Sequence, residues 1–216
     1  VPFTGSTRSS VSMKDTLSGL EGRHVHLNVI NVGWVSEFSD SNEELGRRRV
    51  DYAIMRTRQI FEQANLGVGR VQHWRIDQDE ADGYDNLGSS GEADDLSDDW
   101  GVDNNGIDCF VVRTISASGD DGFVGISPRP GDCDKGGKRD GLIAGAIDRG
   151  GSVADTSDRL DRFARTFAHE IGHYLGLPHN HGKNCPSGSA RNNLMAQTKC
   201  ITIDAFDAVN LTSSQS

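Results

Sequence analysis

Three histidines within one short stretch of the chain are spaced so that they could hold a single metal ion. His169 and His173 lie four positions apart, so a helix would place both imidazoles on one face, one turn apart. Gly176 can adopt the left-handed conformation that ends a helix, and the chain can then turn back to bring His179 beside the other two. Three protein nitrogens leave one coordination position open, which is the arrangement of a catalytic zinc site rather than a structural one.

Glu170 follows the first histidine and lies too far round a helix to be a third ligand. It could instead take a proton from a water molecule at the open position, as a general base does. Two histidines four apart are more often ordinary residues without a metal, but here the longer pattern HExxHxxGxxH is complete and favours catalytic zinc. His181 could replace His179 as the third ligand, although the position of Gly176 favours His179.

The extended histidine pattern and a later methionine resemble the metzincin zinc endopeptidases. In that family a tight turn that carries a methionine, the Met-turn, lies beneath the metal, and Asn193-Leu194-Met195 follows the last histidine at a suitable distance. The resemblance implies a zinc-dependent endopeptidase that hydrolyses peptide bonds with a zinc-activated water and with Glu170 as the general base. It implies one catalytic Zn²⁺ with these ligands: His169, His173 and His179.

Other positions leave the metzincin subfamily open. Asn180, which follows the third histidine, does not match the usual marker of the astacins, serralysins, matrixins or adamalysins. Gln197 lies two positions after Met195, where astacins and serralysins have a tyrosine, so no tyrosine ligand is expected. The cysteines on both sides of the Met-turn are faintly similar to the pappalysins. A different class of function is a zinc-containing binding or toxin module without proteolytic activity; the intact Glu170 counts against it.

The elements that must position these residues follow from the pattern of apolar residues. Five segments predict strands by alternation or by their content of branched residues: 23–32, 66–76, 107–115, 122–127 and 141–148. Residues 40–65 predict a long helix, and a second one that carries the histidines begins near Ser157 or Asp158. This order predicts an α/β (α+β) fold with a twisted mixed five-stranded sheet and helices on one side, which also matches the metzincin plan.

We expect one metalloprotease catalytic domain over residues 1–216. Its upper lobe spans about 1–179, and a small, mostly irregular lower lobe spans about 180–216. In metzincins an antiparallel edge strand above the zinc cleft pairs with an extended substrate. By analogy, the substrate-binding strand is expected at Gly122, Phe123, Val124, Gly125 and Ile126.

The charge balance narrows the classes of partner. Asp and Glu number 32 against 22 Lys and Arg, which gives a net charge of −10 and argues against nucleic acid as a partner. The sequence contains no run of eighteen apolar residues, the length that could span a membrane. We expect a monomer that acts on protein or peptide substrates. Residues 77–106 are rich in Asp, Gly and Asn and predict irregular structure; they could hold a structural Ca²⁺ or be a flexible acidic loop.

The four cysteines allow three pairings, and none of them lies in a CxxC pair. We favour Cys185 with Cys200, which would bracket the Met-turn, and Cys109 with Cys133. Disulfides imply an oxidising compartment, so we expect a secreted protein. The first residues, Val1-Pro2-Phe3, are typical of a processed chain from which a signal peptide has been removed.

Overall fold

The computed structural model describes residues 22–33, 40–116, 125–132, 135, 137–138, 140–145, 157–181, 184–197, 200 and 205–215. For residues 40–47 and 157–159 it describes the backbone alone. No helix in these ranges is long and apolar enough to cross a membrane.

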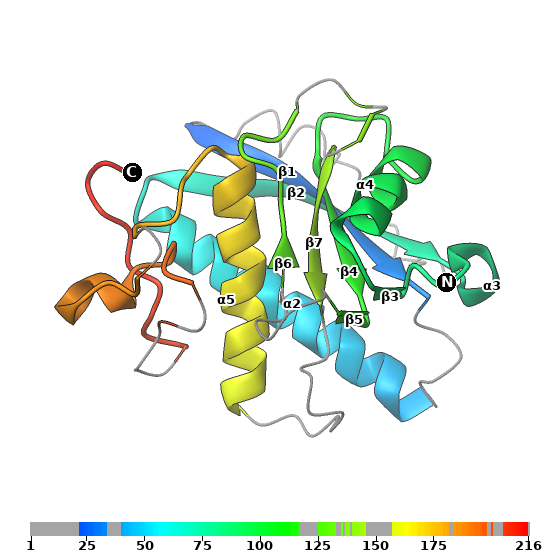
Figure 1. Ribbon diagram of the computed structural model, residues 1–216, viewed down its shortest axis with the longest axis horizontal. Coiled ribbons are helices and arrows are strands. Elements are labelled where there is room, and N and C mark those ends of the chain that lie inside the picture. The colour runs from blue at the N-terminus through cyan, green and yellow to red at the C-terminus, as the bar shows by residue number, and fades with distance from the viewer. Residues whose placement is uncertain are drawn as a thin grey trace, which may run out of the picture.

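Five strands form one mixed sheet in the order β2-β1-β4-β7-β6 (Figure 1). β1, β2, β4 and β7 run parallel to one another, whereas β6 runs antiparallel to β7 at one edge. The predicted α/β fold with a five-stranded mixed sheet is therefore confirmed. The strands are β1 (Arg23–Val32), β2 (Leu66–Ile76), β4 (Ile107–Val112), β6 (Gly125–Ile126) and β7 (Gly141–Gly145).

The two long helices, α2 (Asp40–Glu62) and α5 (Ser157–Tyr174), pack against each other and against one face of this sheet. Alternate strand residues such as Leu27 and Val29 enter this core, as the period of two requires. The hydroxyl of Tyr52 in α2 donates a hydrogen bond to Asp161 in α5, which links the two helices. The sheet and α2 thereby support the helix that carries the histidines.

The acidic segment 77–106 is more regular than its composition predicts. It contains α3 (Gln78–Ala81), β3 (Asn86–Leu87) and α4 (Ser90–Asp99). The Ser89 hydroxyl accepts a hydrogen bond from the Glu92 amide and caps α4. Ala93 and Leu96 are buried with Ile30 and other residues of the opposite sheet face. The prediction of irregular structure is wrong, and so is the prediction that all helices lie on one side.

The predicted strand 107–115 is also divided. β4 ends at Val112, and β5 (Thr114–Ile115) pairs with β3 in a separate two-stranded sheet. The amides of Arg113 and Thr114 both donate to the Asp85 carbonyl, which draws the chain away from the main sheet. The continuous run of branched residues gives no sign that the chain leaves the main sheet and pairs with β3 instead.

The chain after α5 forms a small lower lobe at the left of Figure 1, with little regular structure in the described residues of 180–215. It contains a 3-10 helix, η1 (Gly188–Asn192), and a single bridge between Asn193 and Asn210. This agrees with the predicted irregular lobe.

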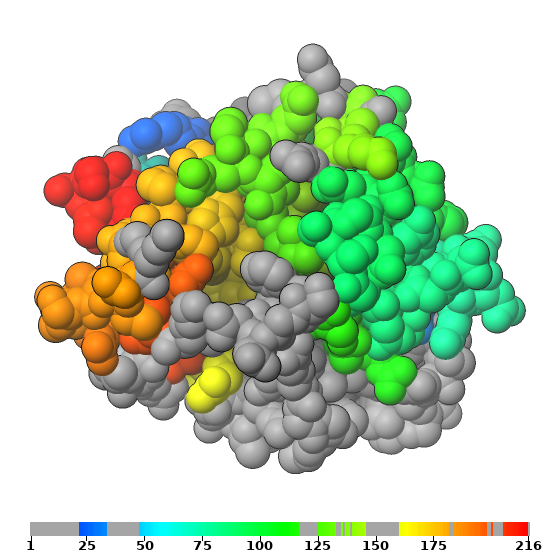
Figure 2. All heavy atoms as spheres, viewed as in Figure 1, coloured from blue at the N-terminus to red at the C-terminus, as the bar shows by residue number. Residues whose placement is uncertain are grey.

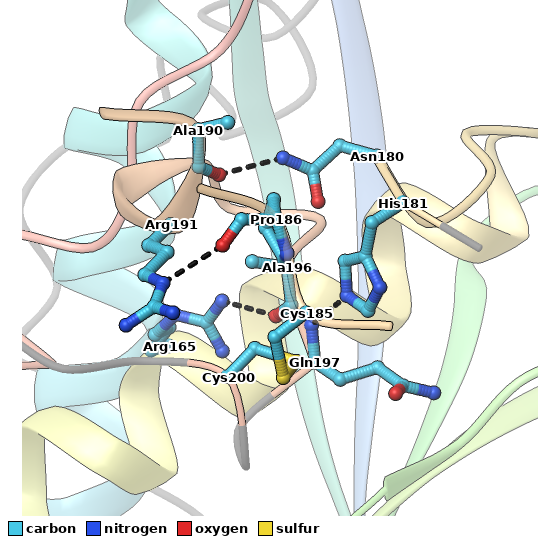
Figure 3. The surroundings of a disulfide bond; sticks show 10 residues. All are labelled: Arg165, Asn180, His181, Cys185, Pro186, Ala190, Arg191, Ala196, Gln197 and Cys200. Atoms are coloured by element: carbon cyan, nitrogen blue, oxygen red, sulfur yellow. Dashed lines mark hydrogen bonds between the residues drawn. A yellow bond between two sulfur atoms is a disulfide. The ribbon is translucent and has the colours of Figure 1, made fainter. Parts of the chain in front are cut away.

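One of the two predicted disulfides is present. Cys185 and Cys200 are bonded, with their Cα atoms 5.1 Å apart (Figure 3). Cys109 is a free thiol, so the predicted bridge to Cys133 is wrong; Cys133 itself lies outside the described residues. The physical reason is that the Cys109 side chain is fully buried in the apolar core between the sheet and the long helices.

Candidate metal centre

The end of α5 places His169 and His173 side by side and then reverses the chain. α5 ends at Tyr174, and Gly176 adopts a positive φ of 96°. The Gly176 amide donates to the His173 carbonyl and the Leu177 amide to the Gly172 carbonyl, which is a Schellman motif. The glycine predicted to end the helix therefore does so, and the chain returns with His179 beside the helix.

The three predicted histidines meet at one point. Each of His169, His173 and His179 offers a ring nitrogen, and these nitrogens all lie within 4.8 Å of one another. The Nε2 atoms of His173 and His179 are 3.1 Å apart. Among the described residues this is the one group of three or more potential ligands. The acidic residues described in 77–106 form no such group, so nothing there indicates a calcium site.

Hydrogen bonds at the other ring nitrogen orient two of these imidazoles. His169 Nδ1 lies 2.7 Å from the Leu194 carbonyl oxygen, and His173 Nδ1 lies 2.7 Å from the Leu177 carbonyl oxygen. A carbonyl oxygen can only accept, so each Nδ1 carries the proton and each Nε2 keeps its lone pair. Carbonyl partners of this kind orient histidines that bind metals.

The separation between the Nε2 atoms of His173 and His179 fits two ligands of one zinc ion. Tetrahedral zinc with Zn–N bonds of about 2.0–2.1 Å holds its ligand nitrogens about 3.3 Å apart, close to the separation between His173 and His179. The Nε2 lone pair of His173 faces Nε2 of His179, so this close contact requires a cation or a proton between the two nitrogens. His181 does not join the cluster, because its Nε2 accepts a hydrogen bond from the Gln197 amide at 3.1 Å (Figure 3).

Burial keeps these histidines neutral. Burial, together with the neighbouring His173 ring, lowers the pKa of His169 to about 3 and that of His179 to about 4. Burial also lowers the pKa of His173, and the positive charge of Arg129 acts in the same direction. All three rings are therefore uncharged at neutral pH, which is the form that a metal ion requires.

Glu170 lies beside this cluster, beneath the edge strand. Its side chain is buried, and burial raises its pKa to about 8, while the positive charge of Arg165 acts in the opposite direction. A Cβ atom at Gly125 in β6 would lie only 2.7 Å from Glu170 Cδ. Glycine at this position therefore lets the edge strand approach the carboxyl group directly. Of the predicted edge-strand residues, Gly125 and Ile126 form β6, whereas Gly122, Phe123 and Val124 lie outside the described residues.

Met195 packs against the helix that carries His169 and His173. Its side chain is fully buried, and a Cβ atom at Gly172 would lie 2.7 Å from its sulfur. The absence of a side chain at Gly172, between the two helical histidines, lets the sulfur pack against α5. The Met195 amide donates to Asn193 Oδ1, and its carbonyl accepts from the Asn180 amide. In Figure 2, the orange segments of the lower lobe lie at the left, and the yellow and gold surface of α5 and the residues after it lies between them and the green segments.

Sequence reasoning missed one residue of this region, Arg165. Its side chain is buried one helical turn before His169 and bonds to the chain around Met195. Its place in the sequence gave a signal, because it falls on the helix face that four-residue spacing shares with His169 and His173. The carbonyl groups that it binds come from distant residues, which no local pattern reveals.

We expect Glu170 to make the stability of the metal-free protein depend on pH. Its folded-state pKa of about 8 lies above its ordinary value of 4.5, so protonated Glu170 contributes stability below pH 4.5 that is lost as the pH rises through about 8. The free energy of unfolding of metal-free Glu170→Gln should therefore rise relative to wild type between pH 5 and pH 8, by on the order of a few kcal/mol. Denaturant titrations of both proteins at both pH values measure this change. Histidine contributions cancel in the difference, and a difference that is constant with pH contradicts the prediction.

Comparison with known proteins agrees with this geometry. A family model described as metallo-peptidase family M12B, reprolysin-like, matches residues 25–205. Among solved structures, the chain is similar to archaemetzincin from Methanopyrus kandleri, at 14% identity over 91% of this chain and 94% of that one, with a TM-score of 0.54. It is also similar to metalloproteinase-II from Bacteroides fragilis, at 10% identity over 94% of this chain and 58% of that one, with a TM-score of 0.51.

At these identities the solved structures show a shared fold. No curated protein sequence matches the chain. The family match spans most of the chain, and the converging histidines lie within it. The chain therefore belongs to the M12B reprolysin-like family of metallopeptidases and is a zinc hydrolase of metzincin fold.

Proposed function

We propose that the protein is a secreted endopeptidase in which Glu170 is the general base and His169, His173 and His179 hold one catalytic zinc ion. The observation that carries this proposal is the convergence of three neutral imidazoles beside a buried carboxyl group. The cluster supplies three ligands and leaves a fourth position for water or substrate. An intact base beside it distinguishes an enzyme from a structural zinc module.

When bound, zinc would polarise the scissile carbonyl and lower the pKa of a water molecule. Glu170 then acts at its carboxylate oxygens: it accepts the proton of the attacking water and passes it to the amine that leaves. Glu170 must be ionised to do so, whereas burial raises its pKa to about 8 even with the positive charge of Arg165 nearby. The positive charge of Arg165 favours the ionised form, and a divalent cation nearby would favour it further.

The edge strand β6 is suited to position an extended peptide. β6 pairs with β7 on one side, and its other edge bounds the sheet in the described part of the chain. A substrate strand could add to that edge through main-chain hydrogen bonds. Because Gly125 touches Glu170, a peptide held there would have its backbone close to the base.

Gly125→Ala is expected to lower kcat/KM by about 10- to 100-fold, because the added methyl group would displace the Glu170 carboxyl group. Gly67→Ala is the matched control: it is also a strand glycine, but a Cβ atom there would make an ordinary contact of 3.6 Å with His24. Steady-state kinetics with a fluorogenic peptide measure both variants. Equal activity of Gly125→Ala and Gly67→Ala would show that the close contact with Glu170 is not needed.

A protease assay with and without a chelator tests the proposed activity. The purified protein should release fragments from a dye-labelled unfolded protein, lose this activity when zinc is chelated, and recover it when zinc is restored. A binding or toxin module without proteolytic activity would take up zinc yet release no fragments under any of these conditions. That outcome would exclude the proposed endopeptidase.

The Cys185–Cys200 bridge supports the proposal that the protein is secreted, because disulfides persist in oxidising compartments. Immunodetection in the culture medium and in the cell fraction of the source organism tests this. Exclusive recovery from the reducing interior of the cell would contradict it.

A further inference from the structure

Arg165 places a positive charge inside the protein at the junction of α5 and the lower lobe. Among the residues that the structure describes, it is the largest side chain that is fully buried. Its Nε donates to the Ala208 carbonyl at 2.8 Å. Its Nη2 lies 3.2 Å from the Asn193 carbonyl oxygen, 2.8 Å from that of Leu194 and 2.5 Å from that of Ala196. Figure 3 shows the bond to Ala196.

These contacts hold the segment on which the first histidine depends. The Leu194 carbonyl accepts hydrogen bonds both from Arg165 Nη2 and from His169 Nδ1. Residues 193–196 also carry Met195, whose sulfur packs against Gly172. One guanidinium therefore fixes the carbonyl that sets the tautomer and the orientation of the His169 ring.

The chemistry of the guanidinium suits this position. Arginine presents five donors in a rigid planar fork, whereas the lysine ammonium is a compact point charge on a flexible stem. Burial lowers the pKa of Arg165 to about 10, so the group remains a cation at neutral pH. A buried cation is costly unless it is hydrogen-bonded, and here main-chain carbonyls of the lower lobe accept from Nε and Nη2.

We propose that Arg165 is a positioning residue of the metal centre: by anchoring the Leu194 carbonyl, it orients His169 for zinc. This inference rests on the proposed ligation of zinc by the three histidines. It goes beyond that ligation, because it assigns the shape of the Met-turn in this chain to one side chain of α5. Other hydrogen bonds also hold the lower lobe together: the Leu194 amide donates to the Asn210 carbonyl, and the Asn210 amide donates to the Asn192 carbonyl.

Arg56 offers a matched control. It is also a buried arginine, and its guanidinium also donates to a lower-lobe carbonyl, that of Phe206 at 2.8 Å. The guanidinium also stacks on the Phe206 ring, with Cζ of Arg56 3.9 Å from the ring centroid. The carbonyl that it is shown to bind lies outside residues 193–196, so Arg56→Lys should perturb the lower lobe without changing the support of His169.

The experiment measures the zinc dissociation constant of each metal-free, folded protein by competition with a chromogenic chelator. Arg165→Lys should weaken zinc binding by about 10- to 100-fold, as loss of the groups that orient metal ligands does, whereas Arg56→Lys should bind zinc as wild type does. The absorption bands of the cobalt-substituted protein should shift in Arg165→Lys and stay unchanged in Arg56→Lys. Arg165→Gln, which keeps two donors without the charge, serves as a second variant if Arg165→Lys does not fold.

The outcomes separate this inference from the proposed function. If wild type binds one zinc ion and a folded Arg165 variant binds it equally tightly with an unchanged cobalt spectrum, the positioning role is wrong and the proposed ligation stands. An equal loss of affinity in Arg56→Lys would also overturn it, since general loosening of the lower lobe would then explain the effect. If His169→Ala binds zinc as tightly as wild type, the proposed ligation itself fails.

Discussion

Glu170→Ala is expected to retain zinc and to lower kcat by about 10²- to 10⁴-fold, the contribution of a general acid–base group. The reason is that the three imidazoles that form the cluster remain, while the group placed to accept the proton is removed. Metal analysis of the purified variant and kinetics with a fluorogenic peptide measure the two effects separately.

Two further variants make this test specific. Glu170→Gln keeps the shape of the side chain and removes the base, so it should lose as much activity as Glu170→Ala. Glu80→Ala removes an exposed carboxylate of α3 and should act as wild type does. Peptidase activity that survives in zinc-loaded Glu170→Ala would contradict the assigned role.

His179→Ala is expected to weaken zinc binding by about 100-fold or more. Structural zinc sites with four ligands bind with about 10–16 kcal/mol, so an average share per ligand is about 3 kcal/mol. Loss of the third imidazole also leaves only the two ligands that α5 itself carries, and activity should disappear with the metal. Chelator competition gives the dissociation constant, and zinc analysis after dialysis gives the stoichiometry.

His181→Ala is the control for this prediction and tests the competing third ligand. Its ring stacks near that of His179, with centroids 5.9 Å apart, but its Nε2 is bonded to the Gln197 amide. Zinc binding should therefore survive in His181→Ala. Loss of zinc in His181→Ala together with retention in His179→Ala would reverse the assignment.

The parts of the fold that the sequence predicts are those set by local pattern. β1 and β2 have the predicted bounds, because alternation of branched residues is a property of the strand itself. The spacing of His169 and His173 implies a shared helix face, and Gly176 marks the left-handed residue after the helix. These local rules are sufficient to identify the histidine cluster.

The features that the sequence did not predict depend on tertiary partners. α4 is a short helix stabilised by a serine cap and by two buried apolar residues, Ala93 and Leu96. Most of its other residues are acidic or polar, so the sequence shows little apolar periodicity from which to predict a helix. Cys109 is a free thiol because it lies on the face of β4 that packs into the core, and the sequence does not show which face that is. The role of Arg165 depends on carbonyl groups 28 to 43 positions away in the chain.

The central claim is that His169, His173 and His179 bind one zinc ion beside Glu170. Crystals grown with zinc, with diffraction measured on both sides of the zinc absorption edge, test this directly. We expect one anomalous peak about 2.0–2.1 Å from a ring nitrogen of each of the three histidines, with the Glu170 carboxyl group outside bonding distance. Zinc located elsewhere in active, zinc-loaded protein, with no peak among these three rings, would contradict it.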